Sequence, residues 1–188
     1  MRAPILNTPR LRLRGWQQND LAPFAAMNRD PQVMEFFPKL LERSESDERA
    51  NRFGERHFEQ RGVGWWAVEL VDGSCFIGCV GLLARPVEFP FSPCVEIGWR
   101  LARAHWGKGY ATEAARTALA FGFGARGLEE IVSFTVPANV RSRAVMEKLG
   151  MVRNPDDNFE HPGLPECHSL RPHVLYRLNR EAWLSAMG

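Results

Sequence analysis

Lysine and long apolar runs are both scarce in this sequence. Of the 24 basic residues only Lys39, Lys108 and Lys148 are lysines, and the formal net charge is +2. That charge is too small to indicate a nucleic-acid partner by itself. No apolar run approaches the roughly 20 residues that a membrane-spanning helix needs, and the N-terminus lacks the apolar core of a signal peptide. We therefore expect a cytoplasmic protein with neither a nucleic-acid nor a membrane partner.

Cysteine is also sparse, with four residues and no Cys-x-x-Cys pair. No histidine spacing typical of a zinc site accompanies them, and the histidines and glutamates near the C-terminus fit no common ligand pattern. We expect no metal, buried free thiols in a reducing compartment, and a tail loop that faces a substrate. The residues concerned are Cys75, Cys79, Cys94 and Cys167, together with Glu160, His161, Glu166, His168 and His173.

The hydrophobic residues, 45% of the 188, are sufficient for one substantial core, so residues 1–188 are expected to form a single domain. Alternating and helical periodicities predict the elements, with Asp20 as the cap of the first helix. The expected strands cover residues 11–14, 64–70, 75–83, 94–101, 130–136 and 173–178. The expected helices cover residues 22–27, 44–60, 110–123 and 139–150. This order indicates an α/β (α+β) fold on a mixed sheet.

Residues 105–113, HWGKGYATE, place two glycines and a lysine directly before a helix rich in small residues. Glycines allow positive φ and close approach of a ligand, and the first amides of a helix favour an anion. The stretch predicts a phosphate or pyrophosphate site made mostly of main chain. It matches neither the P-loop pattern nor Gly-x-Gly-x-x-Gly. The alternative is a tight turn whose glycines only permit the chain to reverse.

A second segment, residues 139–151, begins with a capping asparagine and continues as a helix with one apolar face. Asn139 and Ser142 lie one turn apart, so both can present polar groups on one side. Taken alone, this segment is typical of an ordinary capped helix.

Together, these motifs resemble the GNAT family of acyl-CoA N-acyltransferases. The resemblance rests on EIGWRL at 96–101, WGKGYATEA at 106–114, Asn139-x-x-Ser142 and EKLGM at 147–151. The stretches TPRLRLR at 8–14 and DPQVM at 30–34 are similar to the branch that contains the RimJ/RimL ribosomal-protein acetyltransferases. The similarity extends over nearly the whole chain.

The resemblance implies a GNAT-type fold, a mostly antiparallel sheet that splays apart to hold acetyl-CoA between flanking helices. The pantetheine arm would pair with the strand of Ile97, Trp99 and Leu101 as an added strand does. Asn139 would contact that arm near the thiol, and Arg143 would approach the 3′-phosphate, or else lie in solvent. The pyrophosphate would be held by main-chain amides of Gly107, Lys108, Gly109, Tyr110 and Ala111.

Two positions depart from the family pattern. Ala104 occupies a place where a Gln or Arg is usual, so this position supplies no arginine contact to phosphate, although Arg103 is adjacent. Met146 replaces the tyrosine that protonates the departing thiolate in many members.

The implied reaction is attack of a neutral amine on a thioester, which requires a group that accepts the amine proton. Glu96 is the candidate base because some family members place a general-base glutamate there; a charged cross-strand residue is the alternative. Ser142 is the remaining hydrogen-bond donor for the leaving sulfur, since Met146 cannot serve.

We therefore predict an acetyl-CoA-dependent N-acetyltransferase whose acceptor is a protein N-terminus or a small amine, with a homodimer left open. The alternative is a non-catalytic acyl-CoA-binding sensor, which the missing tyrosine would favour. Nucleotide phosphate binding is a third hypothesis.

Overall fold

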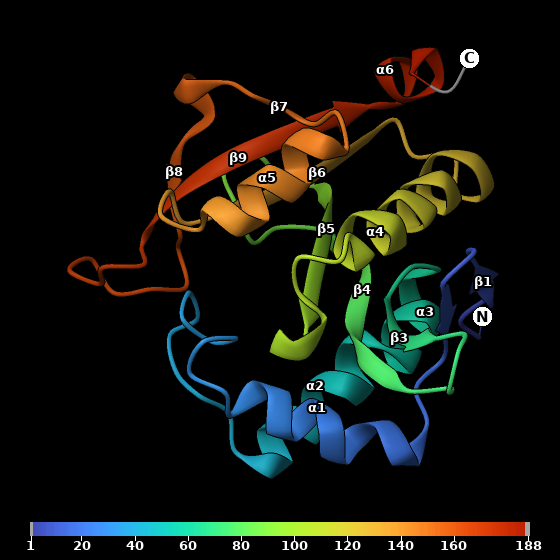
Figure 1. Ribbon diagram of the computed structural model, residues 1–188. Helices are drawn as coiled ribbons and strands as arrows, with labels where there is room; N and C mark the ends of the chain where they lie inside the picture. The colour runs from blue at the N-terminus through green and yellow to red at the C-terminus, as the bar shows by residue number, and fades with distance from the viewer. Residues whose placement is uncertain (1, 187–188) are drawn as a thin grey trace.

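The computed structural model describes residues 2–186, which form nine strands and six α-helices. The strands belong to one sheet, and the helices lie around it (Figure 1). The strands are β1 (Leu6–Asn7), β2 (Leu11–Arg14), β3 (Trp65–Leu70), β4 (Phe76–Arg85), β5 (Cys94–Leu101), β6 (Glu130–Thr135), β7 (Val152–Arg153), β8 (Phe159–Glu160) and β9 (Pro172–Asn179). The helices are α1 (Leu21–Asn28), α2 (Arg43–Phe53), α3 (Glu55–Arg61), α4 (Tyr110–Ala120), α5 (Val140–Lys148) and α6 (Arg180–Ser185). Within this part of the chain, no helix has the length and apolar character needed to cross a bilayer.

The sheet is mixed and mostly antiparallel, as the sequence predicts. Its order is β1-β2-β3-β4-β5-β6-β9-β7, with β8 paired to β9. The one parallel contact joins β5 to β6, and it has a single register pair, Glu96 with Val132. Ser133 donates from Oγ to the carbonyl of Ile97 at 2.9 Å just beyond that pair. Beyond this point the two strands diverge, so the main chain of Gly98–Leu101 has no strand partner on that side.

Helix α4 packs closely on the sheet because its inner face is built from alanine. Ala114, Ala115 and Ala118 are fully buried against core residues that include Ile97 and Ile131. Helix α5 lies beside α4, and Arg116 donates to the carbonyl of Lys148 at 3.2 Å (Figure 1). The predicted close packing of this helix on a flat surface is confirmed. The α-helix ends at Ala120, before the predicted end at about residue 123, and a π-helical turn over Phe121–Ala125 follows it directly.

The single helix expected over residues 44–60 is also wrong, since α2 and α3 are separate helices divided at Gly54. At Gly54 a Cβ atom would lie 2.5 Å from the carbonyl oxygen of Ala50 and 2.5 Å from Cδ1 of Trp16. The indole of Trp16 packs against this point and donates to the carbonyl of Trp65 at 2.8 Å. Local periodicity could not reveal that a distant ring leaves no room for a side chain at this position.

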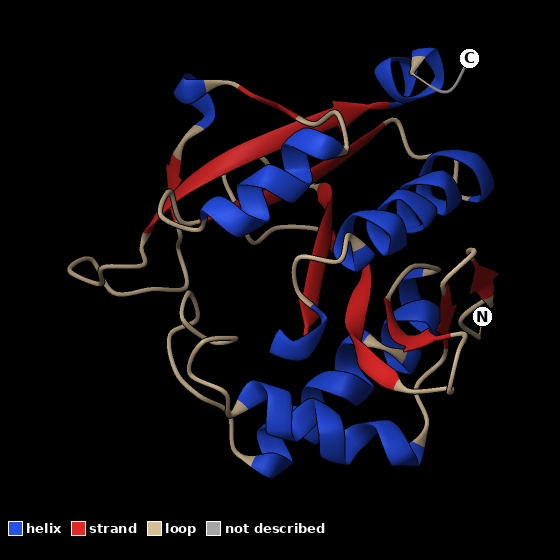
Figure 2. Cartoon of the chain, in the orientation of Figure 1, coloured by secondary structure: helices blue, strands red, loops and turns tan. Residues whose placement is uncertain are grey.

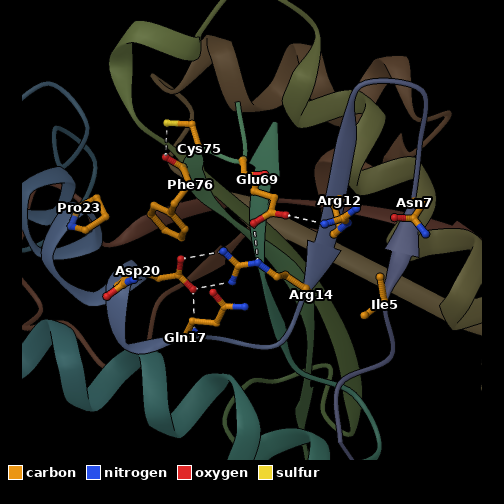
Figure 3. A pocket seen from close by; sticks show the side chains of 12 residues that line it. Ile5, Asn7, Arg12, Arg14, Gln17, Asp20, Pro23, Glu69, Cys75 and Phe76 are labelled. Carbon is orange, nitrogen blue, oxygen red and sulfur yellow. Dashed lines mark hydrogen bonds and ion pairs between the residues drawn. The ribbon is translucent and has the colours of Figure 1, made fainter. Parts of the chain in front are cut away.

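Asp20 precedes α1 but does not cap it through its side chain, which corrects the sequence expectation. Its carboxylate instead accepts from the guanidinium of Arg14 at 2.7 and 2.9 Å. Glu69 accepts from Nε of the same arginine at 2.6 Å, so one buried cation joins two carboxylates (Figure 3). These bonds raise the pKa of Arg14, led by the bond to Asp20. A cavity of about 730 Å³ is lined by Arg14, Asp20 and Glu69, whose charges are already paired with one another.

Other expectations are confirmed or corrected in detail. The strands expected at 11–14 and 94–101 match β2 and β5, whereas β1, β7 and β8 have only two residues each and lacked a pattern. All four cysteines are free, but Cys75 and Cys167 are exposed, so the expectation of buried thiols is wrong for these two.

His57 of α3 bonds to the main chain of β4 in the part of that strand that lies beyond Trp65, the first residue of β3. Its Nε2 accepts from the amide of Ala84 at 3.0 Å. Burial, reinforced by the nearby charge of Arg85, lowers the pKa of His57 to about 4. An unfolded histidine takes up a proton near pH 6.5, whereas this folded one resists it down to about pH 4.

The free energy of unfolding is therefore expected to decrease as the pH falls from the unfolded pKa towards the folded one, since the unfolded chain binds more protons there. The decrease from His57 is about 1–2 kcal/mol after allowance for solvent screening. Urea unfolding at a series of pH values measures it. His57→Gln keeps an acceptor without a titrating group and should remove this part of the slope. An unchanged slope would show that His57 does not couple protonation to folding.

Candidate active site

A cavity of about 880 Å³ opens where β5 and β6 diverge. Its wall is formed by β5, the turn before α4, the start of α5, and two long loops. These loops run from α1 to α2 and from β8 to β9, and they lie on the same side of the molecule (Figure 2). The loop before β9 contributes His161 and Leu164, and His173 lies at the start of β9.

The glycine–lysine–glycine turn forms one end of this cavity. Gly107 and Gly109 have φ of 72° and 80°, the left-handed region that favours glycine. A Cβ on Gly107 would meet no atom within 4 Å, and one on Gly109 would lie 3.5 Å from Arg10 Nη2. The first backbone bond of α4 runs from the amide of Glu113 to the carbonyl of Gly109 at 3.0 Å. The amides that precede Glu113 in this turn have no helical partner, as expected at a helix N-terminus.

The N-terminal segment before β2 braces this turn. Thr8 Oγ1 donates to Glu113 at 2.5 Å, and Arg10 Nε donates to the same carboxylate at 2.6 Å. Arg10 Nη1 also donates to the carbonyl of Lys108 at 3.0 Å, and its guanidinium stacks over the ring of Tyr110. Burial works to raise the pKa of Glu113, but the bonds from Thr8 and Arg10 hold that pKa below its ordinary value. The turn is thus held in shape from outside the cavity.

Strand β5 presents two different faces. Ile97 and Leu101 belong to the core shared with α4, and Trp99 packs against that core. Glu96, Gly98 and Arg100 alternate with them, and Glu96 and Arg100 lie opposite Leu83 and Cys79 of β4.

Glu96 is held by Arg85 from the neighbouring strand. Its Oε2 accepts from Nε of Arg85 at 2.9 Å and lies 2.8 Å from Nη2. Its Oε1 lies 4.0 Å from the position that a Cβ of Gly98 would occupy, a position with no other neighbour within 4 Å. Burial raises the pKa of Glu96, and the charge of Arg85 offsets part of that effect. One carboxylate oxygen therefore faces open space while the other holds the side chain in place.

At the start of α5 the side chain of Asn139 is already engaged by the protein. It accepts from the amide of Ser142 at 3.1 Å and donates to Oγ1 of Thr135 at 3.0 Å. Ser142 and Val145 also line the cavity, whereas Met146 is buried in the core. The two tyrosines of the chain are Tyr110, at the turn, and Tyr176, whose hydroxyl donates to Glu147 at 3.0 Å. Tyr110 is thus the one phenol that lines this cavity among the described residues.

The structure brings most of the predicted site residues to one cavity, but not all. Arg143 does not line it. The guanidinium of Arg143 donates to Tyr176 Oη at 3.2 Å and to the carbonyl of Pro137 at 3.1 Å. Lys108 is also outside the lining, and its carbonyl accepts from Arg10. The predicted residues that do line the cavity are Glu96, Ile97, Trp99, Leu101, Gly107, Gly109, Tyr110, Ala111, Asn139 and Ser142.

Sequence reasoning missed the residues that hold and surround Glu96. Arg85, Arg49, Arg100 and the aromatic residues Phe37 and Phe53 also line the cavity. They come from α2, β4, β5 and the loop before α2, so local spacing relates only Arg49 to Phe53 and Arg100 to Glu96. The alternation of Glu96 and Arg100 on one face of a predicted strand was the available signal.

Comparison with known proteins was consistent with this geometry. A family model described as "Acetyltransferase (GNAT) domain" matches residues 10–152. The uncharacterized protein YkkB of Bacillus subtilis is 35% identical over 147 residues, which cover 78% of this chain and 84% of YkkB.

Two solved structures share the fold at lower identity. The spermidine N-acetyltransferase of Vibrio cholerae, in complex with CoA and spermine, has a TM-score of 0.73 at 20% identity, over 94% of this chain and 99% of its own. The ribosomal-protein-S5-alanine acetyltransferase of Vibrio fischeri has a TM-score of 0.74 at 19% identity, over 96% and 99%. At these identities the likeness concerns the fold alone.

Proposed function

The chain belongs to the GNAT family of acetyltransferases, and on that premise we propose that it transfers the acetyl group of acetyl-CoA to a primary amine. The observation that carries this proposal is the cavity where β5 and β6 diverge. Both the glycine-rich turn before α4 and Glu96 line it, and one carboxylate oxygen of Glu96 accepts no hydrogen bond from Arg85. The sensor alternative is not favoured, because the family is one of enzymes.

The residues of the turn and of β5 fit coenzyme A. Positive φ at Gly107 and Gly109, and the open Cβ position at Gly107, leave room for a diphosphate against the amides that begin α4. The edge of Ile97, Trp99 and Leu101 has no strand partner beyond the contact with β6, so it offers main-chain partners to the amides of the pantetheine arm. The carbonyls of Ile97 and Leu101 already accept from Ser133 Oγ and Trp106 Nε1, which leaves Trp99 as the main contact. Lys108 and Ala111 would add their own amides to this cradle.

Acetyl-CoA supplies an acetyl group already activated as a thioester, so the nitrogen–carbon bond forms as the carbon–sulfur bond breaks. The amine must lose a proton in the process. Glu96 Oε1, which faces the open floor over Gly98, accepts that proton directly or through water. Arg85 holds the carboxylate in place. Ser142, which lines the cavity, donates a hydrogen bond to the departing sulfur.

Assignment to the RimJ/RimL-like branch is part of the same proposal. It is supported by the segment of residues 8–14, whose Thr8 and Arg10 brace the turn. The ribosomal-protein acetyltransferase shares the fold. The spermidine enzyme shares the fold equally well, so the fold does not choose the acceptor.

An acceptor screen tests the function. Free thiol released from acetyl-CoA is measured with N-terminal peptides, amino acids, polyamines and other small amines, and mass spectrometry identifies the acetylated product. Acceptor-dependent thiol with a matching product is the expected result. Tight acetyl-CoA binding without acceptor-dependent thiol from any pool would instead favour a sensor.

The brace of the turn yields a separate prediction. Glu113→Gln removes the ion pair with Arg10 and should raise the Kd for acetyl-CoA about threefold to tenfold, equivalent to about 1 kcal/mol. Calorimetry measures the Kd. Glu129→Gln, which breaks an exposed ion pair with Arg180 outside the cavity lining, is the matched control. Tighter binding by Glu113→Gln would mean that its charge mainly repels phosphate, and the bracing role would be wrong.

A further inference from the structure

Two arginines line the part of the cavity between β5 and α2, and neither forms an ion pair with a carboxylate of the described chain. From their placement we infer that the acceptor is a small amine that also carries a carboxylate, bound by Arg100 and Arg49 while its amino group lies at Glu96. This inference rests on the proposed acetyl transfer and specifies the substrate class of that site.

Arg100 carries most of the argument because it is buried. It is 5% exposed and lines the cavity, yet the ion pairs of residues 2–186 do not include it. Nη1 donates to Oδ1 of Asn28 at 2.6 Å, and Nε has no hydrogen-bond partner in the described structure. A buried charge without a counter-charge is unfavourable, so its retention suggests a ligand that supplies one.

The surroundings of Arg100 keep it charged but leave its Nε donor without an acceptor. Its guanidinium lies 4.0 Å from the ring centroid of Phe37 and 5.8 Å from that of Trp65. These rings stabilise a cation without accepting its N–H bonds. Burial lowers the pKa of Arg100 to about 10, so it remains protonated near neutral pH. The planar guanidinium has five N–H donors, a geometry that suits a carboxylate.

Arg49 adds a second positive charge to the same wall. It is half-buried on α2, lines the cavity, and forms no ion pair within the described part of the chain. Burial is the main cause that lowers the pKa of Arg49, and the charge of Glu45 opposes the shift. Glu45 itself pairs with Lys39. Arg49 is therefore available to a ligand.

The carboxylates of the lining are already paired, which argues against polycationic acceptors. Glu88 and Glu96 are the two acidic residues of the lining, and both pair with Arg85. A diamine or polyamine would meet two uncompensated arginines, whereas an amino acid would place opposite charge beside them. Gly98 lies between Glu96 and Arg100 on the same face of β5, and its missing side chain leaves open space there. An acceptor lying on this strand can therefore reach both residues.

The test compares acceptors that differ in one group. Amino carboxylic acids of increasing chain length, their carboxamides and the diamines of equal length are compared by thiol release and by calorimetry on the CoA-loaded protein. Carboxylates should show kcat/KM at least about tenfold above their carboxamides, as expected for a charge-assisted hydrogen bond. Arg49→Met should remove most of that advantage by raising KM. Arg56→Met, an exposed arginine on the adjacent α3 that is absent from the lining, should not.

Arg100→Lys is a second variant, and it too should reduce the advantage of carboxylates over carboxamides by raising KM. Its folding is checked by thermal denaturation. Equal use of carboxamides or diamines, with Arg49→Met affecting all acceptors alike, would overturn this inference and leave acetyl transfer intact. A failure of every acceptor, N-terminal peptides included, to release thiol or bind would overturn the proposed function as well.

Discussion

Gly109→Val is expected to raise the Kd for acetyl-CoA about a hundredfold, equivalent to about 2.7 kcal/mol. Gly109 has φ of 80°, so a branched side chain strains the turn. Its Cβ would also lie 3.5 Å from Nη2 of Arg10, so a valine would press on the side chain that braces the turn. Both effects move the amides away from the diphosphate. Calorimetry with acetyl-CoA and with CoA measures the change.

Gly73→Val is the matched control for the backbone strain. Gly73 lies in the turn between β3 and β4, has φ of 85°, and has no atom within 4 Å of its Cβ position. It is absent from the cavity lining. We expect this variant to lose stability while it binds acetyl-CoA with wild-type affinity. Equal affinity in both variants would show that the turn before α4 does not hold the diphosphate.

Glu96→Gln should reduce kcat about 10²–10⁴-fold, the usual contribution of a positioned general base. The amide keeps an acceptor for Arg85 but cannot take a proton from the amine. The Kd for acetyl-CoA should change less than about twofold, because the cofactor is held by main chain. Steady-state kinetics and calorimetry separate the two quantities.

The pH dependence supplies a second measure of the same role. A base works only when deprotonated, so the wild-type rate should fall as the pH drops through the pKa of Glu96. Burial raises that pKa, so the fall should begin at a higher pH than for an exposed glutamate. Glu96→Gln should lack this limb of the profile.

Glu88→Gln controls for the loss of a carboxylate on Arg85. Glu88 accepts from Nη1 of Arg85 at 2.9 Å and is the more exposed partner. A modest effect on kcat is expected. If Glu96→Gln retained the wild-type rate across the pH range, water or another group would have to accept the proton.

The sequence anticipated the parts of the fold that depend on neighbours along the chain. The alternation over residues 94–101 and the alanine face of residues 111–118 follow from strand and helix periods, so β5 and α4 were predicted. The division at Gly54 was not, and the ring of Trp16, which occupies the space beside this glycine, is distant in sequence. The same reason applies to Asp20, whose carboxylate is used by Arg14 instead of by the helix.

The candidate site divides in the same way. The motif at residues 105–113 predicted an anion site, since glycines that permit positive φ before a helix leave amides unpaired whatever the rest of the chain does. The family resemblance implied that Arg143 approaches the 3′-phosphate or else lies in solvent, and neither resemblance nor spacing can show that its donors reach Tyr176 and Pro137.

By itself, the amino-acid sequence determined the mixed sheet, the helix rich in small residues, the family resemblance and the cradle motif, because each is written in local periodicity or in contiguous residues. Tertiary structure alone decided that Arg85 holds Glu96. It also decided that Arg49 and Arg100 both line the cavity and that neither forms an ion pair with a carboxylate of the described chain. These residues come from α2, β4 and β5. Charge compensation depends on distance in space, so only the folded chain reveals which of its 24 basic residues lack a partner.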